Sequence, residues 1–284
     1  IYQLTREEIP SSHVYMEAQI FAPDSKRFLL HRSAHAHGSD LHDPEHRYLV
    51  CELEEGGALR PLTHETGATA PSVTSDGQWV YYFVNETELN GGRLTLKRVR
   101  WDGAERQTIM VVDAPLPGTS YRPSRIYPLS TISSDGQRIA FLRGRSSDRQ
   151  PMLLDMAAGA AARAVDFPPA RVYGMSWLDA ATIVLASDSE GMRALVAVPL
   201  DGAAPTLLGA PGARRPDRAG DGALIWEVAR YQAHLWRLDV DGDEVELTTH
   251  RRSDGNPVLS PDGRRLAFQS NREGPDSVWL LDLQ

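Results

Sequence analysis

A turn built on aspartate recurs six times along the chain and restricts the fold more than any other feature of the sequence. The six turns read Pro23-Asp24-Ser25, Ser75-Asp76-Gly77, Ser134-Asp135-Gly136, Leu178-Asp179-Ala180, Gly220-Asp221-Gly222 and Pro261-Asp262-Gly263. Successive aspartates are separated by 52, 59, 44, 42 and 41 residues. A repeat of about 40 to 50 residues with several strands in each unit is typical of β-propeller blades.

The residues that follow the turns favour strands. Runs rich in β-branched, aromatic and aliphatic side chains occupy positions 79–83, 138–142, 182–185, 224–228 and 264–268. Further strands follow in several units, and three of the later hairpin turns read Asp102-Gly103, Asp201-Gly202 and Asp241-Gly242. No amphipathic helix of useful length lies between these segments. We therefore predict an all-β chain that forms one domain over residues 1–284.

The two ends of the chain favour a closed ring. The last unit stops after its third strand, near Leu283. The segment Tyr2-Gln3-Leu4-Thr5 resembles the ends of two fourth strands, Arg60-Pro61-Leu62-Thr63 and Val245-Glu246-Leu247-Thr248. An N-terminal strand that completes the C-terminal blade would leave no open edge in the ring. The prediction is a single six-bladed β-propeller of four-stranded antiparallel blades, closed in this way.

Strand direction decides which loops share a face of such a ring. The Asp turns join strands one to two and three to four, so they all lie on one face. The loops between strands two and three and the links between blades lie on the other, where the channel mouth forms a funnel. Six segments are expected around that funnel, at positions 12–17, 66–71, 121–127, 171–173, 214–218 and 250–256.

Arginine is concentrated in the last four of these segments. The residues are Arg122, Arg125, Arg171, Arg214, Arg215, Arg218 and one of Arg251 and Arg252. The chain has a formal net charge of −8, which argues against nucleic-acid binding. Because the arginine fork matches a carboxylate, the cluster favours a mouth that accepts an anionic small molecule or oligosaccharide. The alternative is that these arginines cap carbonyls or pair with acids between blades.

A histidine-rich insertion lies between strands two and three of the first unit. Five of the nine histidines occur at positions 31–46, in a loop that is expected to hang over the funnel beside His13 and Glu17. His35 and His37, with a nearby acid, are candidate ligands for a divalent metal such as Mn, Ca or Zn. Histidine is also the usual general acid or base. The alternative is a solvated polar loop without a ligand.

The repeat resembles that of TolB-type propellers, most clearly at positions 256–268. Positions 13–30, Arg60-Pro61-Leu62-Thr63 and positions 269–274 also resemble the oligogalacturonate lyase family. That resemblance implies β-elimination on a uronate, with a base, a cation that stabilises the enolate, and an acid. It also implies seven blades and a manganese site with a His-Pro-His-Pro run. This chain has six units and reads Asp254-Gly255-Asn256-Pro257 at that run.

Two functions from different classes follow. The first is a lyase that acts on a uronate-containing oligosaccharide; its catalytic candidates are His13, Glu17, Arg122, Arg125 and Tyr127. Its substrate-binding candidates are Tyr15, Tyr173, Arg218, Arg252 and Asn256. The second is a non-catalytic TolB-like propeller that binds a protein, peptide or sugar.

The remaining features concern the cellular compartment of the chain. No apolar stretch is long enough to span a bilayer, so a membrane partner is not expected. Cys51 is the only cysteine, so it forms no internal disulfide. The N-terminal residues lack the features of a signal peptide, which favours the cytoplasm. The periplasm or secretion is the alternative if a signal peptide has been removed.

Overall fold

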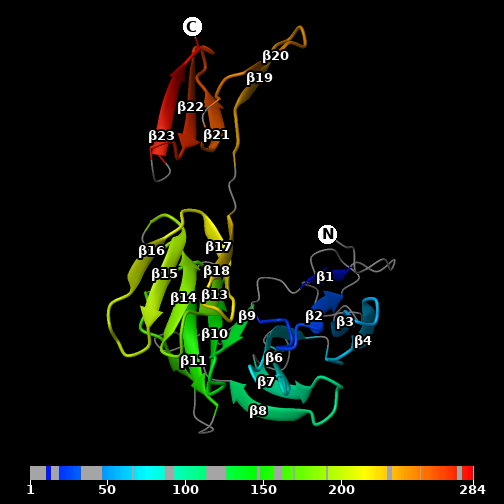
Figure 1. Cartoon of the computed structure of the whole chain (residues 1–284). Helices are drawn as coiled ribbons and strands as arrows, with labels where there is room; N and C mark the ends of the chain where they lie inside the picture. Colours follow the sequence, from blue (N-terminus) through cyan, green and yellow to red (C-terminus); the bar gives the residue numbers. More distant parts are fainter. Residues whose placement is uncertain are drawn as a thin grey trace. The chain divides into compact units, whose positions relative to one another are not determined.

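The computed structural model describes most of the chain, and within it the secondary structure consists of strands and turns (Figure 1). The described residues are 11–13, 19–32, 47–65, 67–86, 93–112, 126–145, 148–156, 162–168, 170–189, 191–228, 232–249, 251–273 and 277–283. In these ranges no helix is long and apolar enough to cross a membrane.

Four antiparallel sheets of four strands follow one another along the chain. They are β1 (Ser11–His13), β2 (Arg27–Arg32), β3 (Arg47–Glu52) and β4 (Ala58–Pro61); β5 (Ala68–Val73), β6 (Trp79–Glu86), β7 (Arg93–Arg100) and β8 (Gln107–Val112); β9 (Ile126–Ile132), β10 (Arg138–Arg145), β11 (Asp148–Asp155) and β12 (Arg163–Ala164); and β13 (Val172–Trp177), β14 (Thr182–Ser187), β15 (Ala194–Pro199) and β16 (Thr206–Gly209). Each Asp turn joins the first two strands of its sheet. The all-β fold with four-stranded antiparallel blades is thus confirmed.

The last two repeats form smaller sheets. β17 (Ala213–Arg218) pairs with β18 (Leu224–Val228), and β19 (Trp236–Leu238) pairs with β20 (Glu244–Glu246). β21 (Asp254–Leu259), β22 (Arg265–Ser270) and β23 (Ser277–Asp282) form a three-stranded sheet. The chain divides into two compact units, Ile1–Ser189 with Arg193–Glu227, and Glu190–Met192 with Val228–Gln284. We call the second the C-terminal unit; one domain over the whole chain stays a prediction.

The repeated aspartates form the same hydrogen bond in every unit. The Oδ1 atom of each accepts the backbone N–H two residues later at 2.7 to 3.1 Å, from Lys26, Gln78, Gln137, Ala181, Ala223 and Arg264. Three units add a hydroxyl two residues earlier. The Ser133 hydroxyl, for example, donates to Asp135 at 2.5 Å and accepts the N–H of Arg138 at 3.0 Å. The Asp turn recurs because its side chain replaces backbone partners in the reversal.

Acid is expected to weaken the fold partly through these hydroxyl-bonded turns. Hydrogen bonds from Thr74, Ser133 and Ser260 hold the pKa of the following turn aspartates below the usual value. A lowered pKa adds stability that is complete above the unfolded value, about 3.9, and is lost as the pH falls through the folded value. The variant Thr74→Ala/Ser133→Ala/Ser260→Ala removes the three hydroxyl bonds. In thermal melts from about pH 5 to pH 2, its Tm should decrease less than that of the wild type. Equal decreases would contradict this origin.

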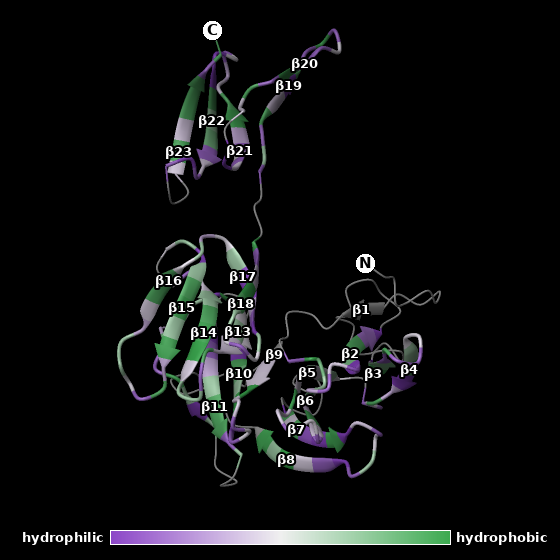
Figure 2. Ribbon diagram, in the orientation of Figure 1, coloured by the Kyte–Doolittle hydropathy of each residue, from purple (hydrophilic) through white to green (hydrophobic). Residues whose placement is uncertain are grey.

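Adjacent sheets pack through apolar side chains. The ring of Phe83 on β6 lies 4.9 Å from that of Phe141 on β10, centroid to centroid, and both side chains are fully buried. Met175 and Trp177 on β13 join a cluster with Leu142 and Leu153 from the sheet before. Figure 2 shows the hydrophobic bands that β14 and β15 contribute to this core. These contacts arise because both faces of an inner blade are covered by neighbouring blades.

Polar side chains join the innermost strands. Ser72 on β5 hydrogen-bonds Ser130 on β9 at 2.7 Å, and Ser130 also donates to the Ala70 carbonyl. The Gln19 amide pairs with both backbone groups of Ile132 at 2.5 and 2.6 Å. The serine bonds connect β5 with β9, and Gln19, which precedes β2, connects the first repeat to the end of β9, so polar bonds link three repeats of the first unit.

The funnel segments overlap the first strands, where the sequence places them before those strands. Arg214 to Arg218 make up most of β17, and Asp254 to Asn256 begin β21. In β21 the ladder continues because a bulge absorbs the irregular backbone. Asn256 has a left-handed φ of 52° beside the register shift between Gly255 and Val258. Arg214 to Arg218 and Asp254 to Asn256 therefore belong to strands and not to the loops predicted before them.

A Leu-Thr pair at the end of the fourth strand makes the same two hydrogen bonds in two repeats. In the first sheet, Leu62 N–H donates to the Tyr48 carbonyl, and Thr63 Oγ1 accepts the Tyr48 N–H at 3.0 Å. In the fifth repeat, Leu247 and Thr248 make the same pair of bonds to Leu235. The predicted counterpart, positions 2–5, lies outside the described residues. Ring closure by that segment therefore stays a prediction.

Candidate functional site

The structure describes half of the residues singled out in the sequence. His13 lies on β1 opposite Leu30, and Tyr127 lies on β9. Tyr173 and Arg218 lie on β13 and β17 of the first unit, whereas Arg252 and Asn256 belong to the C-terminal unit. The others lie outside the described residues, namely Tyr15, Glu17, His35, His37, Arg122 and Arg125. The proposed catalytic group is therefore still a prediction.

Tyr173 is held by its neighbours. Its hydroxyl donates to Asp188 Oδ2 at 3.2 Å, and Asp188 Oδ1 accepts the backbone N–H of Arg171 at 3.1 Å. The guanidinium carbon of Arg193 lies 4.6 Å from the centroid of the Tyr173 ring. The hydroxyl and one face of the ring are thus already in contact with protein groups. This arrangement fastens the start of β13 to the residues after β14.

Two mouth arginines share one carboxylate. Arg214 and Arg215 donate to the two oxygens of Glu227 at 3.3 and 2.9 Å. Glu227 lies on β18, which pairs with β17, so these arginines pair with an acid of their own sheet and not with an acid between blades. Arg252 is exposed, and so is Asn256, whose amide donates to Gln269 Oε1 at 2.7 Å.

The first histidine of the insertion, His31, belongs to the blade interior. It lies on β2, is buried, and its ring centroid is 5.4 Å from that of Tyr48. The backbone pairing of β2 with β3 places these two residues opposite each other. His31 thus contributes to packing in the first sheet.

An ion pair with a buried carboxylate occupies the position where the lyase resemblance implies metal-binding histidines. Asp254, at the start of β21, is 1% exposed, and its Oδ1 accepts a hydrogen bond from Arg272 Nη2 at 2.9 Å. Arg272 Nε donates to Ser270 Oγ at 3.0 Å. Burial opposes ionisation of Asp254, but bonds from Ser270, Arg272 and Thr248 together hold the pKa of its carboxyl below the usual value. The pair is therefore ionic at neutral pH.

Aromatic rings flank the same guanidinium. The guanidinium carbon of Arg272 lies 4.9 Å from the centroid of Phe268 and 5.0 Å from that of Trp279. Phe268 is on β22 and Trp279 is opposite it on β23. A guanidinium placed over aromatic faces and bonded to a carboxylate has little freedom to reorient. Arg272 is thus a positive charge with a defined position.

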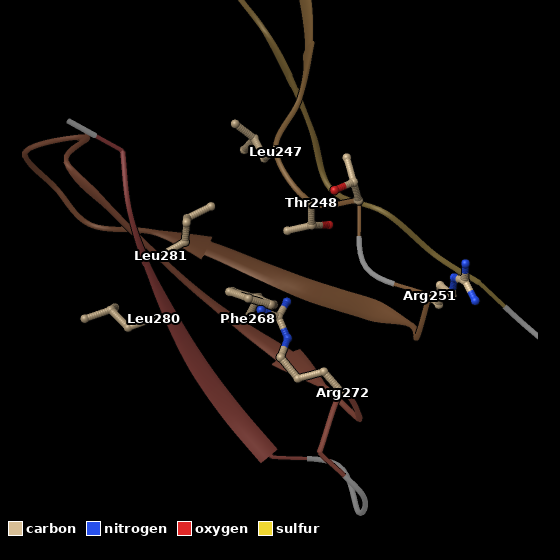
Figure 3. Close-up of a pocket in the computed structure, with 8 residues that line it drawn as sticks. Leu247, Thr248, Arg251, Phe268, Arg272, Leu280 and Leu281 are labelled. Carbon is tan, nitrogen blue, oxygen red and sulfur yellow. The ribbon is translucent and has the colours of Figure 1, made fainter.

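Arg272 lines a pocket of about 540 Å³ in the C-terminal unit (Figure 3). Its lining residues are Leu247, Thr248, Thr249, Arg251, Phe268, Arg272, Leu280 and Leu281. Arg272 lies within positions 269–274, which resemble a loop of the lyase family, but it was not among the predicted site residues. Its importance depends on Asp254, 18 residues earlier, and on rings from two strands. Pattern matching within one loop does not reveal those partners.

The residues at this position do not fit a divalent metal. Arg272 places a positive charge 2.9 Å from the carboxylate that would have to bind the ion, and the Asn256 amide is paired with Gln269. Within the described ranges, no group of three or more His, Cys, Asp or Glu side chains could hold a metal ion. The metal predicted at His35 and His37 lies outside those ranges and stays a prediction.

Solved structures with similar folds include TolB and an oligogalacturonate lyase. TolB from Acinetobacter baumannii is 15% identical with a TM-score of 0.53, and the match covers 91% of this chain and 61% of that protein. This chain thus spans about three fifths of that TolB. An oligogalacturonate lyase in complex with manganese is 14% identical with a TM-score of 0.56. The match covers 99% of this chain and 92% of that protein.

A protein assigned as TolB from Agrobacterium tumefaciens is 14% identical with a TM-score of 0.58, covering 98% of this chain and 84% of that protein. Identities this low establish a common fold, which hosts several activities. No curated protein matches the chain significantly. A family model does match, over residues 37–260, and that range includes most of the repeats described above. The chain therefore belongs to the family of the lipoprotein LpqB β-propeller domain.

Proposed function

We propose that this chain is a non-catalytic β-propeller that binds an anionic ligand. The observation that carries the proposal is the Arg272 guanidinium, which is anchored by buried Asp254 and lines a pocket together with Arg251. A planar guanidinium can bind a carboxylate through two parallel hydrogen bonds without a metal ion. The site offers a recognition group where the lyase resemblance implies a metal.

The donors of Arg272 support this role. Nη2 donates to Asp254 and Nε to Ser270, so among the described contacts the Nη1 donors have no acceptor. Asp254 balances the charge of Arg272, and Arg251 adds a second positive charge to the lining. The pocket thus carries one excess positive charge in a chain whose net charge is −8. Local charge of this sign favours an anionic ligand.

The lyase hypothesis is the alternative, and an absorbance assay separates the two. The chain is incubated with oligogalacturonate, with and without Mn²⁺, Ca²⁺ or Zn²⁺, and the ultraviolet absorbance of an unsaturated product is followed. We expect no increase under any condition. An increase in the wild type that disappears in His13→Ala and Arg125→Ala would establish the lyase and overturn the non-catalytic proposal.

Anion binding has its own measurement. Citrate at about ten times its Kd should add about 1.4 kcal/mol to the unfolding free energy and raise Tm. Chloride at the same ionic strength is the reference. The increase should be absent in the double variant Arg251→Gln/Arg272→Lys, which removes one charge and the planar fork. No citrate-specific increase in the wild type at any concentration would contradict the proposal.

A further inference from the structure

Gln19 of the first repeat bonds the first strands of the next two repeats at the ends that lie beside the Asp turns. Its backbone carbonyl accepts the N–H of Val73, the last residue of β5, at 3.1 Å. Its side-chain Oε1 accepts the N–H of Ile132, the last residue of β9, at 2.6 Å, and Nε2 donates to the Ile132 carbonyl at 2.5 Å. Val73 and Ile132 each stand three residues before a turn aspartate, Asp76 and Asp135. One glutamine thus connects the turn-side ends of three repeats.

The backbone groups that Gln19 bonds belong to the free edges of these strands. β5 and β9 are terminal strands of their sheets, and each pairs with one neighbour, β6 or β10. The N–H groups of Thr74 and Ser133 bond those neighbours, so the alternation of a β-ladder directs the N–H groups of Val73 and Ile132 to the opposite edge. Backbone groups on a free edge need water or another protein group as a partner. Here Gln19 takes the place of water.

The polar residues beside Gln19 are closed to solvent as well. Ser72, Ser130 and Thr131 are fully buried, although side chains that lined a water-filled passage would be accessible. Ser72 bonds Ser130 at 2.7 Å, and Trp177 Nε1, from the fourth repeat, donates to the Thr131 carbonyl at 3.0 Å. Among the described residues, the turn-side ends of β5 and β9 are therefore packed against protein groups.

We propose that Gln19 seals the turn-side end of these strands, so that ligands reach the first strands of this compact unit from one end only. The open end is the opposite one, where the sequence places the funnel. A peptide or oligosaccharide can then bind at that end but cannot pass along the strands from one face to the other. The seal belongs to the unit that does not contain Arg272, so the inference is independent of the proposed anion binding.

The backbone of Gln19 supports a specific role for its side chain. Its φ is 60°, in the left-handed region that is unfavourable for a residue with a Cβ and easy for glycine. Glycine would relieve the backbone but would leave both backbone groups of Ile132 without the amide. Gln19→Gly therefore removes the seal without imposing backbone strain, and the variant is suitable for a test in the folded protein.

Thiol labelling of the full chain measures access to the sealed position. Ser72→Cys places a thiol beside the seal, and Ser75→Cys places one on the exposed turn of the same repeat. Cys51 is buried and is the only native thiol, so the wild type gives the background. With a charged methanethiosulfonate reagent under native conditions, Ser72→Cys should react at least about 100-fold more slowly than Ser75→Cys.

Removal of the seal should expose the position beside it. Adding Gln19→Gly to Ser72→Cys should raise the labelling rate at position 72 at least about tenfold, while Cys51 stays as slow as in the wild type. Peptide mapping by mass spectrometry separates the two thiols. Gln137→Ala is the matched control, because Gln137 is an exposed turn glutamine whose amide donates to the Asp135 carbonyl outside the seal. It should leave both rates unchanged.

Three results would overturn the inference. The first is labelling of Ser72→Cys as fast as that of Ser75→Cys, which would show an open end beside the turns. The second is an unchanged rate at position 72 after Gln19→Gly, which would show that other residues close this end. The third is an equal increase at position 72 and at Cys51, because a general loosening of the first sheet would expose both thiols.

Discussion

The Leu4→Ala variant is expected to lose about 2 to 5 kcal/mol of unfolding free energy, the usual cost of truncating a fully buried leucine. The expectation comes from Leu62 and Leu247, which end fourth strands in sequences like Gln3-Leu4-Thr5. Leu62 is fully buried, and its N–H bonds the third strand of its sheet at 2.9 Å. Among the described residues, the sheet β21–β23 has three strands, and the N-terminal segment would supply the fourth.

The register of the sheets identifies the partner of that segment. Tyr48 lies opposite His31, seven residues after Asp24, and Val278 lies opposite Gln269, seven residues after Asp262. Val278 therefore corresponds to Tyr48, and we expect its N–H to donate to Thr5 Oγ1.

Chemical denaturation measures this effect, with Leu62→Ala as the matched control. If the N-terminal strand completes the sixth blade, the two substitutions should lower the unfolding free energy by similar amounts, about 2 to 5 kcal/mol. A change of less than about 0.5 kcal/mol for Leu4→Ala is what an exposed leucine would give. That result, beside a large effect of Leu62→Ala, would refute closure by this segment.

The Gly174→Ala variant is expected to destabilise the first unit by about 1 to 3 kcal/mol although it adds one methyl group. A Cβ at Gly174 on β13 would lie 2.5 Å from the backbone N and Cα of Arg215 on β17, and 2.6 Å from Pro216 Cδ. The contacted atoms are backbone and a proline ring, so no flexible side chain can move aside. Strands β13 and β17 would have to separate.

Gly220→Ala provides the control for that substitution. Gly220 precedes the turn aspartate of the β17–β18 hairpin, has no atom within 4 Å of a built Cβ, and does not need a left-handed backbone. Alanine there should change Tm little, within about 0.5 kcal/mol in free energy. Equal effects of the two substitutions would show that the close approach of β13 and β17 is not what requires Gly174.

The blade pattern could be predicted because it depends on short-range chemistry. Each Asp turn satisfies its own backbone within five residues, as at Ser133, Asp135 and Arg138, so it leaves a regular spacing in the sequence. Continuous apolar runs of strand-forming residues follow the turns, as at β2 and β14, and they can be recognised from the sequence for the same local reason. Strand boundaries were less predictable at the funnel, where a bulge such as that at Asn256 continues a strand through residues that resemble a loop.

The candidate site could be predicted only in its chemical type. A surplus of arginine at the funnel indicated anion recognition, but residue type alone could not tell a paired arginine from one with free donors. Arg214 and Arg215 share Glu227, whereas Arg272 is held by Asp254 and, among the described residues, its Nη1 has no acceptor. That distinction depends on contacts between strands, which have no fixed spacing along the chain.

The linear order of residues was thus sufficient for the all-β class and the six repeats, because turn chemistry and the preference of apolar runs for strands act over a few neighbours. Folding in three dimensions was needed to bring Asp254, Phe268 and Trp279 around Arg272 and to place Gly174 against Arg215. Those contacts join residues from different strands. Side-chain packing and burial therefore set their geometry and their charge state.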